Sequence, residues 1–272
     1  MSLHLSPLVR RVLFGLTALV LSAAVSLLAT GAFTGGSSKQ SPPTLPRAFH
    51  PPSTRSPVTF SPAAAAARLP RDTNVVARAR RLSVSVYRHA GDRRPYRRVN
   101  ARRVGGRRVP LIFLVDSRRR GWVRAYLPVR PNRQMGWLRA RDVFLAQDPY
   151  RIRIELRRHR LVVYHGARPI AREPIATGRA LSPTPLGRYY VTDLVKPPDP
   201  NGFFGPFAFG LSAFSPVYTT FEGGDGQVGI HGTSDPSLIG RDVSHGCIRV
   251  ANRVITRLAK LLPLGTPVDI AH

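Results

Sequence analysis

Alternating apolar and polar residues predict a series of strands in the second half of the chain. The run RIRIELRRHRLVVYHG, residues 151–166, contains two stretches of period two around a polar turn. Similar short runs are RYYVTDLV, VGIHG and TPVDIA, which end at residues 195, 232 and 271. A period of two is the spacing of side chains on one face of a strand. This part of the chain is therefore expected to be mostly β.

One segment follows the period of a helix instead. The residues RVITRLAKLL come directly after Asn252, and Pro263 and Gly265 follow them. Asparagine is a favourable helix cap, and proline and glycine end helices. We therefore expect one main helix, capped by Asn252 and ended by Pro263. Its apolar face would carry five residues: Val254, Ile255, Leu258, Leu261 and Leu262.

The sequence pattern of residues 74–146 predicts a separate small β module. LSVSVYRH, residues 82–89, alternates like a half-buried strand, and residues 109–145 contain several short apolar runs separated by turn signals. The pattern Gly-Trp-Val at residues 121–123 returns as Gly-Trp-Leu at residues 136–138. In these features the segment resembles the SH3-like modules of bacterial wall-associated proteins, and the resemblance implies a small β-barrel.

The longest apolar run lies at the start of the chain. Residues 12–33 carry no charge and follow Arg10 and Arg11. At about 1.5 Å per residue, a helix of this length spans roughly the hydrocarbon core of a bilayer. The preceding arginines favour an N-terminus on the inside. Residues 1–33 are thus predicted to be a membrane anchor or, because Ala29 and Gly31 suit a cleavage site, a signal peptide.

These patterns divide the chain into four expected parts. Residues 1–33 form a hydrophobic helix that directs export, and residues 34–73 form a linker rich in proline and serine. A small β module at residues 74–146 precedes a β-rich domain with one main helix at residues 149–272. The expected fold class is mainly β, and the expected location of the body is outside the membrane, either anchored or secreted.

The net charge of +28 implies anionic surroundings. Residues 78–141 hold 20 arginines and two aspartates, whereas residues 149–272 hold 15 basic and nine acidic residues. The positive field therefore belongs mainly to the small β module. Export argues against nucleic acid as the partner, which leaves an anionic wall polymer, a membrane surface, or an arginine surface that is simply solvated.

Cys247, in the stretch SHGCIRV, is the single cysteine of the chain, so it forms no disulfide within it. Four interpretations of Cys247 are open: a small buried hydrophobic residue, a link to another molecule, a zinc ligand together with His231 and His245, or a reactive thiol. Three scattered ligands are a weak signal for zinc. As a nucleophile, the thiol would need a base to take its proton. His245 is two residues away and His231 sixteen, and this spacing alone does not decide between them.

Two neighbours of Cys247 have properties that catalysis would use. Gly246 permits a tight turn, so that amides around Cys247 could point at one spot and form an oxyanion hole. Arg249 could bind a substrate carboxylate or pair with a surface acid. Residues 193–214 contain five phenylalanines among prolines and glycines, and this segment is expected to be a lid or part of the core.

The stretch IHGTSDPSLIGRDVSHGCIRV resembles the signature of the L,D-transpeptidases with a YkuD-type catalytic domain. That signature is a histidine-glycine pair, a loop, and then Ser/Thr-His-Gly-Cys. TGRALSPTPLGRYYV and GPFAFGLSAFSP resemble further stretches of this family, and the resemblance covers roughly residues 150–270. Arg249 departs from the asparagine of some members, which puts the acceptor contacts in doubt.

The resemblance implies acyl transfer on peptidoglycan stem peptides without a metal or other cofactor. Cys247 would attack the carbonyl between the third and fourth stem residues, D-alanine would leave, and an amine of a second stem would take the acyl group, giving a 3→3 cross-link. His231 would be the base, oriented by the carbonyl of Gly232. The amides of His245, Gly246 and Cys247 would form the oxyanion hole. The residues lining the site would be Ser244, His245 and Arg249.

Three other functions stay open on the sequence alone. The same thioester could end on water, as in a carboxypeptidase, or on a protein that becomes attached to the wall. A wall-binding protein with a vestigial site is a non-enzymatic alternative, although the set of histidine, serine, glycine and cysteine residues is intact.

Overall fold

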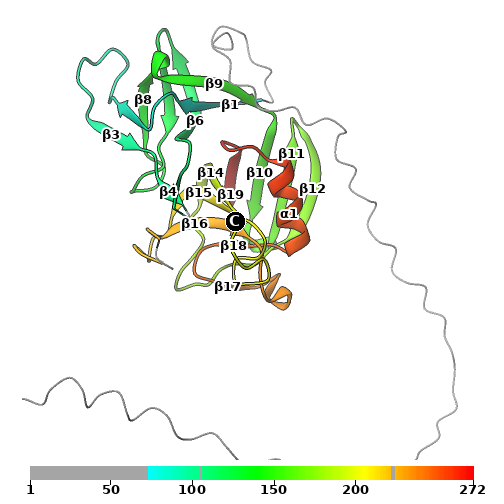
Figure 1. Cartoon of the computed structure of the whole chain (residues 1–272). Coiled ribbons are helices and arrows are strands. Elements are labelled where there is room, and N and C mark those ends of the chain that lie inside the picture. Colours follow the sequence, from blue (N-terminus) through cyan, green and yellow to red (C-terminus); the bar gives the residue numbers. More distant parts are fainter. Residues whose placement is uncertain (1–72, 105, 222–223) are drawn as a thin grey trace, which may run out of the picture. The chain divides into compact units, whose positions relative to one another are not determined.

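The computed structural model describes residues 73–104, 106–221 and 224–272 (Figure 1). The expected hydrophobic helix at residues 1–33 and residues 34–72 of the expected linker lie outside this range. Within it, no helix is long and apolar enough to span a membrane. The described chain is mainly β with a single α-helix, as the sequence predicts.

Residues 74–148 form an antiparallel sheet of five strands in the order β8-β7-β6-β1-β9. Two short hairpins, β2-β3 and β4-β5, accompany it. The expected hairpins are therefore present, while the SH3-like assignment stays a prediction. The strands are β1 (Asn74–Ala79), β2 (Ser83–Val86), β3 (Arg97–Asn100), β4 (Arg103–Val104), β5 (Arg107–Arg108), β6 (Ile112–Arg119), β7 (Trp122–Tyr126), β8 (Met135–Arg139) and β9 (Val143–Asp148).

The following residues form a sheet of eight strands in the order β12-β11-β10-β19-β14-β15-β16-β18. Most neighbours are antiparallel, but β10 pairs in parallel with β19, and β16 in parallel with β18. The strands are β10 (Tyr150–Glu155), β11 (Arg160–His165), β12 (Arg168–Pro174), β14 (Gly187–Val195), β15 (Ala208–Phe214), β16 (Gln227–His231), β18 (Ile248–Arg249) and β19 (Pro267–Ala271). A separate two-stranded pair joins β13 (Thr177–Gly178) to β17 (Asp242–Ser244).

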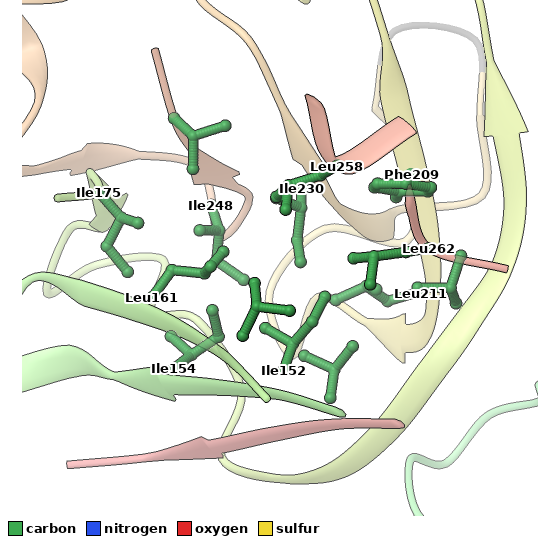
Figure 2. Close-up of a cluster of buried hydrophobic side chains, with 14 of the residues drawn as sticks. Ile152, Ile154, Leu161, Ile175, Phe209, Leu211, Ile230, Ile248, Leu258 and Leu262 are labelled. Atoms are coloured by element: carbon green, nitrogen blue, oxygen red, sulfur yellow. The ribbon is translucent and has the colours of Figure 1, made fainter. Parts of the chain in front are cut away.

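The predicted helix is present as α1 (Asn252–Leu261), and it packs on the larger sheet. Val254, Ile255 and Leu258 are buried in the same cluster as side chains from the sheet. Figure 2 shows Leu258 and Leu262 beside Ile230, Leu211 and other members of this core. Burial of one stripe of apolar residues explains why this short segment is helical.

The predicted cap of this helix is wrong. Asn252 is the first helical residue, and Ala251 occupies the cap position without a side-chain hydrogen bond. The Asn252 side chain instead accepts a hydrogen bond from the amide of Thr233, at 2.8 Å. A contact so distant in sequence outweighs the local capping preference of asparagine.

Buried polar groups join the two sheets. Tyr190 of β14 is fully buried, and its hydroxyl lies 3.0 Å from the carbonyl oxygen of Ile112 and 3.2 Å from that of Tyr126. Asp148 ends β9 and is also fully buried; its carboxylate accepts from the Tyr150 amide and from the Thr266 hydroxyl, each at 2.8 Å. Burial raises the pKa of Asp148 to about 7. The junction is thus held by specific hydrogen bonds rather than by apolar contact alone.

Candidate active site

The parallel pairing of β16 with β18 brings Cys247 and His231 to one cavity. Ile230 is paired with Ile248 and His231 with Arg249, so Cys247, which directly precedes β18, lies close to the end of β16. The cavity has a volume of about 160 Å³ and is lined by both Cys247 and His231. His245 is not among the lining residues. Of the two histidines that sequence spacing left open, His231 is therefore the one that shares a cavity with Cys247.

Cys247 lies in a turn whose shape depends on Ser244 and Gly246. The Ser244 hydroxyl donates to the carbonyl of Cys247 at 2.5 Å and accepts from the amide of Gly246 at 3.0 Å. Gly246 has a φ of +117°, a conformation that side chains other than glycine rarely adopt. The Gly246 amide therefore already has an acceptor, which differs from the expectation that it helps to form an oxyanion hole.

Cys247 is half-buried, and its surroundings keep the thiol protonated at neutral pH. Desolvation raises its pKa above the ordinary value of 9.0, while a hydrogen bond from the Gly229 amide and the charge of Arg249 act in the opposite direction. The Gly229 nitrogen lies 3.4 Å from Sγ. Because the raising effect is the larger one, the resting site does not hold a stable thiolate.

His231 is buried and oriented by a backbone carbonyl. Its Nδ1 lies 2.7 Å from the carbonyl oxygen of Gly232, which can only accept, so Nδ1 carries the hydrogen. Burial lowers the pKa of His231 to about 4, against the raising effect of this hydrogen bond. Nε2 is buried and has no hydrogen-bond partner within the described residues. The ring is therefore neutral at pH 7, with an unshared acceptor on Nε2.

Aromatic rings enclose both histidines. Phe203 and Phe204 have ring centroids 5.7 and 5.1 Å from that of His231. Tyr218 and Phe221 lie 5.5 and 5.2 Å from the ring of His245. Desolvation lowers the pKa of His245, and the charges of Arg179 and Arg249 act in the same direction.

The phenylalanines of residues 193–214 differ in their surroundings, and the expected role as a lid stays a prediction. Phe209 and Phe214 are buried core residues, whereas Phe203 is 42% exposed. Phe204 lines the cavity, as does the buried Phe209. The segment thus contributes both to the core and to the wall of the site.

Arg249 is directed inward rather than toward a surface acid. It is 7% exposed, its guanidinium lies 4.6 Å from the ring centroid of Phe203, and its Nε is buried without a hydrogen-bond partner among the described residues. No ion pair of Arg249 occurs in the described part of the chain. A buried donor of this kind is available to a ligand.

A loop near His245 is held by an arginine from the smaller sheet's segment. Arg130 donates to the carbonyl oxygens of Ser215 and Tyr218, each at 2.8 Å, and to that of Asp225 at 3.0 Å. The side chain of Asn132 donates to the carbonyl of Phe214 and accepts from its amide. The described part of this loop carries Tyr218 and Phe221, so Arg130 acts on the surroundings of His245.

Sequence reasoning missed several residues around the site. Asn252 supports the loop after His231 through Thr233, and a side chain at Gly205 or Gly232 would meet its Oδ1. Asp193, a buried acid of β14, lines the cavity. No local pattern marks these residues, because their roles depend on strand register and on contacts between distant segments. Among the described residues, no group of three His, Cys, Asp or Glu side chains has the arrangement of a metal site.

Comparison with known proteins gives consistent matches. The family model described as "L,D-transpeptidase catalytic domain" (YkuD) matches residues 149–270. A putative L,D-transpeptidase YkuD of Bacillus licheniformis is 38% identical over 122 residues, which are 45% of this chain and 66% of that protein. The putative L,D-transpeptidase YkuD of Bacillus subtilis is 31% identical over 152 residues, 54% of this chain and 84% of that protein.

Parts of the chain are also similar to solved structures. An L,D-transpeptidase from Mycobacterium tuberculosis has a TM-score of 0.38 and 16% identity, covering 53% of this chain and 75% of that one. Bd1075 of Bdellovibrio bacteriovorus has a TM-score of 0.36 and 25% identity. The match covers 46% of this chain and 48%, about half, of Bd1075. The assignment rests on the sequence matches. With 31% identity over 84% of the Bacillus subtilis protein and a family-model match over residues 149–270, the chain belongs to the YkuD family of L,D-transpeptidases.

Proposed function

We propose that this chain is a peptidoglycan L,D-transpeptidase that forms 3→3 cross-links through a thioester on Cys247. Membership of the family implies cysteine-dependent acyl transfer. The observation that supports the assignment to these residues is that Cys247 and His231 line one cavity, and that Nε2 of His231 is an unshared acceptor. A neutral imidazole beside a protonated thiol is the starting state of a general-base mechanism.

In the first half-reaction, Nε2 of His231 takes the thiol proton while Sγ attacks the carbonyl between the third and fourth stem residues. The resulting oxyanion needs amide donors, and we assign this role to the amides of His245 and Cys247, since Ser244 already engages that of Gly246. The C–N bond then breaks, His231 returns the proton to the leaving nitrogen, and D-alanine departs. A thioester remains on Cys247.

In the second half-reaction, the side-chain amine of another stem attacks the thioester carbonyl. His231 takes a proton from the attacking nitrogen, the C–S bond breaks, and the sulfur regains the proton. The product is an amide between two third-position residues. The carbonyl of Gly232 keeps the imidazole in the required tautomer throughout.

The remaining residues of the site are assigned supporting roles. Ser244 fixes the turn that presents Cys247, and Gly246 permits its positive φ. We assign Arg249 and His245 to the substrate side, where the buried Nε of Arg249, which has no partner among the described residues, would donate to a carboxylate. Proteins of this family are generally associated with the cell wall, and we propose an exported location with residues 1–33 as anchor or signal peptide. The basic residues at 78–141 would attract an anionic wall polymer or membrane surface.

The test uses the full chain in detergent with purified disaccharide-tetrapeptide, followed by mass spectrometry of products and protein. We expect a cross-linked dimer, free D-alanine and an acyl adduct on Cys247. Cys247→Ser is expected to remove all three. Cross-linking by the serine variant would contradict the proposal.

The same experiment separates the alternatives. Tripeptide without dimer would indicate that water is the acceptor, as in a carboxypeptidase. An adduct that transfers only to a protein amine would indicate attachment of proteins to the wall. No adduct from folded protein would favour a non-catalytic wall-binding role.

A further inference from the structure

A row of four residues crosses the sheet from Asp193 to Cys247. Asp193 of β14 is paired with Gly210 of β15, and Gly210 is paired with Gly229 of β16. The Gly229 amide donates to Sγ of Cys247 at 3.4 Å. All four residues line the cavity. Because the two middle residues have no side chains, neither of them separates the carboxylate from the thiol.

The carboxylate of Asp193 is buried and only partly satisfied. Asp193 is 2% exposed, and its Oδ2 accepts from the Thr192 hydroxyl at 2.6 Å and from Nε2 of Gln227 at 3.3 Å. Its Oδ1 accepts no hydrogen bond from the described part of the chain. A Cβ on Gly210 would lie 2.4 Å from Oδ1. The carboxylate therefore extends over Gly210, on the side of the row where Cys247 lies.

Asp193 also lacks a cation. In the described residues, no lysine, arginine or histidine nitrogen lies within ion-pair distance of it. Burying a carboxylate is costly, and hydrogen bonds from two neutral groups offset only part of that cost. A ligand that brings its own positive charge would supply the rest.

We propose that Asp193 binds a primary ammonium group of the substrate, with β15 and β16 lying between it and the attacking sulfur. An ammonium has three donors and no acceptor, which suits an oxygen with free lone pairs in a small cavity. The identity of the ligand rests on the proposed function, in which both stem peptides bring a side-chain amine. The shared chemistry is the ammonium, and the donor and acceptor stems are its two possible sources.

The first experiment needs no peptide. Methyl methanethiosulfonate and its aminoethyl analogue both react with Cys247, whose sulfur forms a mixed disulfide while methanesulfinate leaves. The second-order rate constants of the two reagents are measured on the full chain in detergent. We expect Asp193→Asn to lower the ratio of the aminoethyl to the methyl rate constant about tenfold, as for loss of a partly buried ion pair.

Asp199→Asn is the matched control, because it makes the same change of net charge on an exposed residue outside the cavity lining. It is expected to change the ratio less than about twofold. Asp193→Glu keeps the charge and is expected to retain most of the aminoethyl preference. An unchanged ratio in Asp193→Asn, equal changes in Asp193→Asn and Asp199→Asn, or equal losses in the Asn and Glu variants of Asp193 would overturn the proposal.

A second experiment distinguishes the two sources. Thioester formation is timed with a tetrapeptide whose third-residue amine is free, and with the same peptide acetylated at that amine. If the donor's ammonium binds Asp193, acetylation slows acylation of the wild type about tenfold, and Asp193→Asn removes the difference. If the acceptor's amine binds, acylation is equal with both donors and Asp193→Asn slows only the transfer step.

These outcomes separate the two proposals. Absence of a thioester with either donor would contradict the proposed function, whereas the thiosulfonate ratios test the ammonium site by themselves. Normal cross-linking with unchanged selectivity in Asp193→Asn would contradict the ammonium site and leave the transpeptidase proposal intact.

Discussion

At the scale of single residues, His231 and Cys247 are both uncharged at neutral pH. Burial lowers the pKa of the imidazole to about 4 and raises that of the thiol above 9.0. A neighbouring imidazolium would stabilise a thiolate, but the buried ring of His231 does not take up a second proton, on Nε2, at pH 7. In the mechanism that we propose, the proton therefore moves during the attack and not before it.

The reactivity of Cys247 toward iodoacetamide should reflect this state. We expect alkylation at pH 7 to be slower than that of a cysteine in an unstructured peptide, with a rate that still rises above pH 9, because the thiolate fraction is depressed. The measurement is the alkylation rate between pH 5 and 10, with the peptide as control. A plateau below pH 8 would contradict the assignment.

Asp148 should make stability depend on pH. Its pKa is about 7 in the folded chain against an ordinary 3.8, so the folded state keeps a proton that the unfolded state releases between these values. The free energy of unfolding therefore falls as pH rises from about 4 to about 7. Asp148→Asn can keep both hydrogen bonds, from the Tyr150 amide and with the Thr266 hydroxyl.

We expect Asp148→Asn to stabilise the chain at pH 8 and to flatten this pH dependence. The gain is up to about 4 kcal/mol, since one pKa unit corresponds to about 1.4 kcal/mol. Urea unfolding at pH 5 and pH 8 measures it. A variant that is destabilised equally at both pH values would show that the carboxylate is not the source of the effect.

At the scale of elements, the loop that carries Tyr218 and Phe221 depends on Arg130. Three carbonyl oxygens of this loop accept from one guanidinium, a geometry that a smaller side chain cannot reproduce. We expect Arg130→Ala to lower kcat/KM about tenfold while the fold is kept, because the surroundings of His245 lose their support.

Arg124→Ala is the control for this change. Arg124 is exposed at its side chain and lies 3.8 Å from Asp116, so its loss should leave kcat/KM within about twofold of the wild type. Circular dichroism checks the fold of both variants. Equal activity of Arg130→Ala and Arg124→Ala would mean that the loop orders itself without the arginine.

The elements themselves were largely predictable, whereas the contacts between them were not. Alternation marks the strands around residues 151–166, and one apolar stripe marks α1, because burial of one face decides both. Cys247 is found by its uniqueness and its neighbours. Asn252, by contrast, has the local signature of a cap and serves a loop instead, and Asp193 has no signature at all. The position of Asp193 follows from strand register and that of Asn252 from the packing of α1, neither of which a single sequence specifies.

At the scale of the whole molecule, Tyr190 connects the two sheets. Its buried hydroxyl is within hydrogen-bond distance of the carbonyl oxygens of Ile112 and Tyr126 in the smaller sheet. We expect Tyr190→Phe to lower the free energy of unfolding by about 1–3 kcal/mol, because buried acceptors lose their donor. Urea unfolding measures the change.

Tyr164→Phe is the control, since Tyr164 of β11 is half-buried and lies under Arg151. It is expected to change stability by less than about 0.5 kcal/mol. Equal effects of the two substitutions would indicate that the hydroxyl of Tyr190 does not stabilise the junction.

The row from Asp193 to Cys247, with Gly210 and Gly229 between them, also has a fixed length. Neighbouring strands lie about 4.8 Å apart, so the sheet fixes the distance between the carboxylate of Asp193 and the thiol of Cys247. Covalent inhibitors that carry an electrophile and an amine should therefore show a sharp optimum in tether length. Such an optimum would make the selectivity of an inhibitor depend on the spacing between its amine and its electrophile rather than on the choice of reactive group.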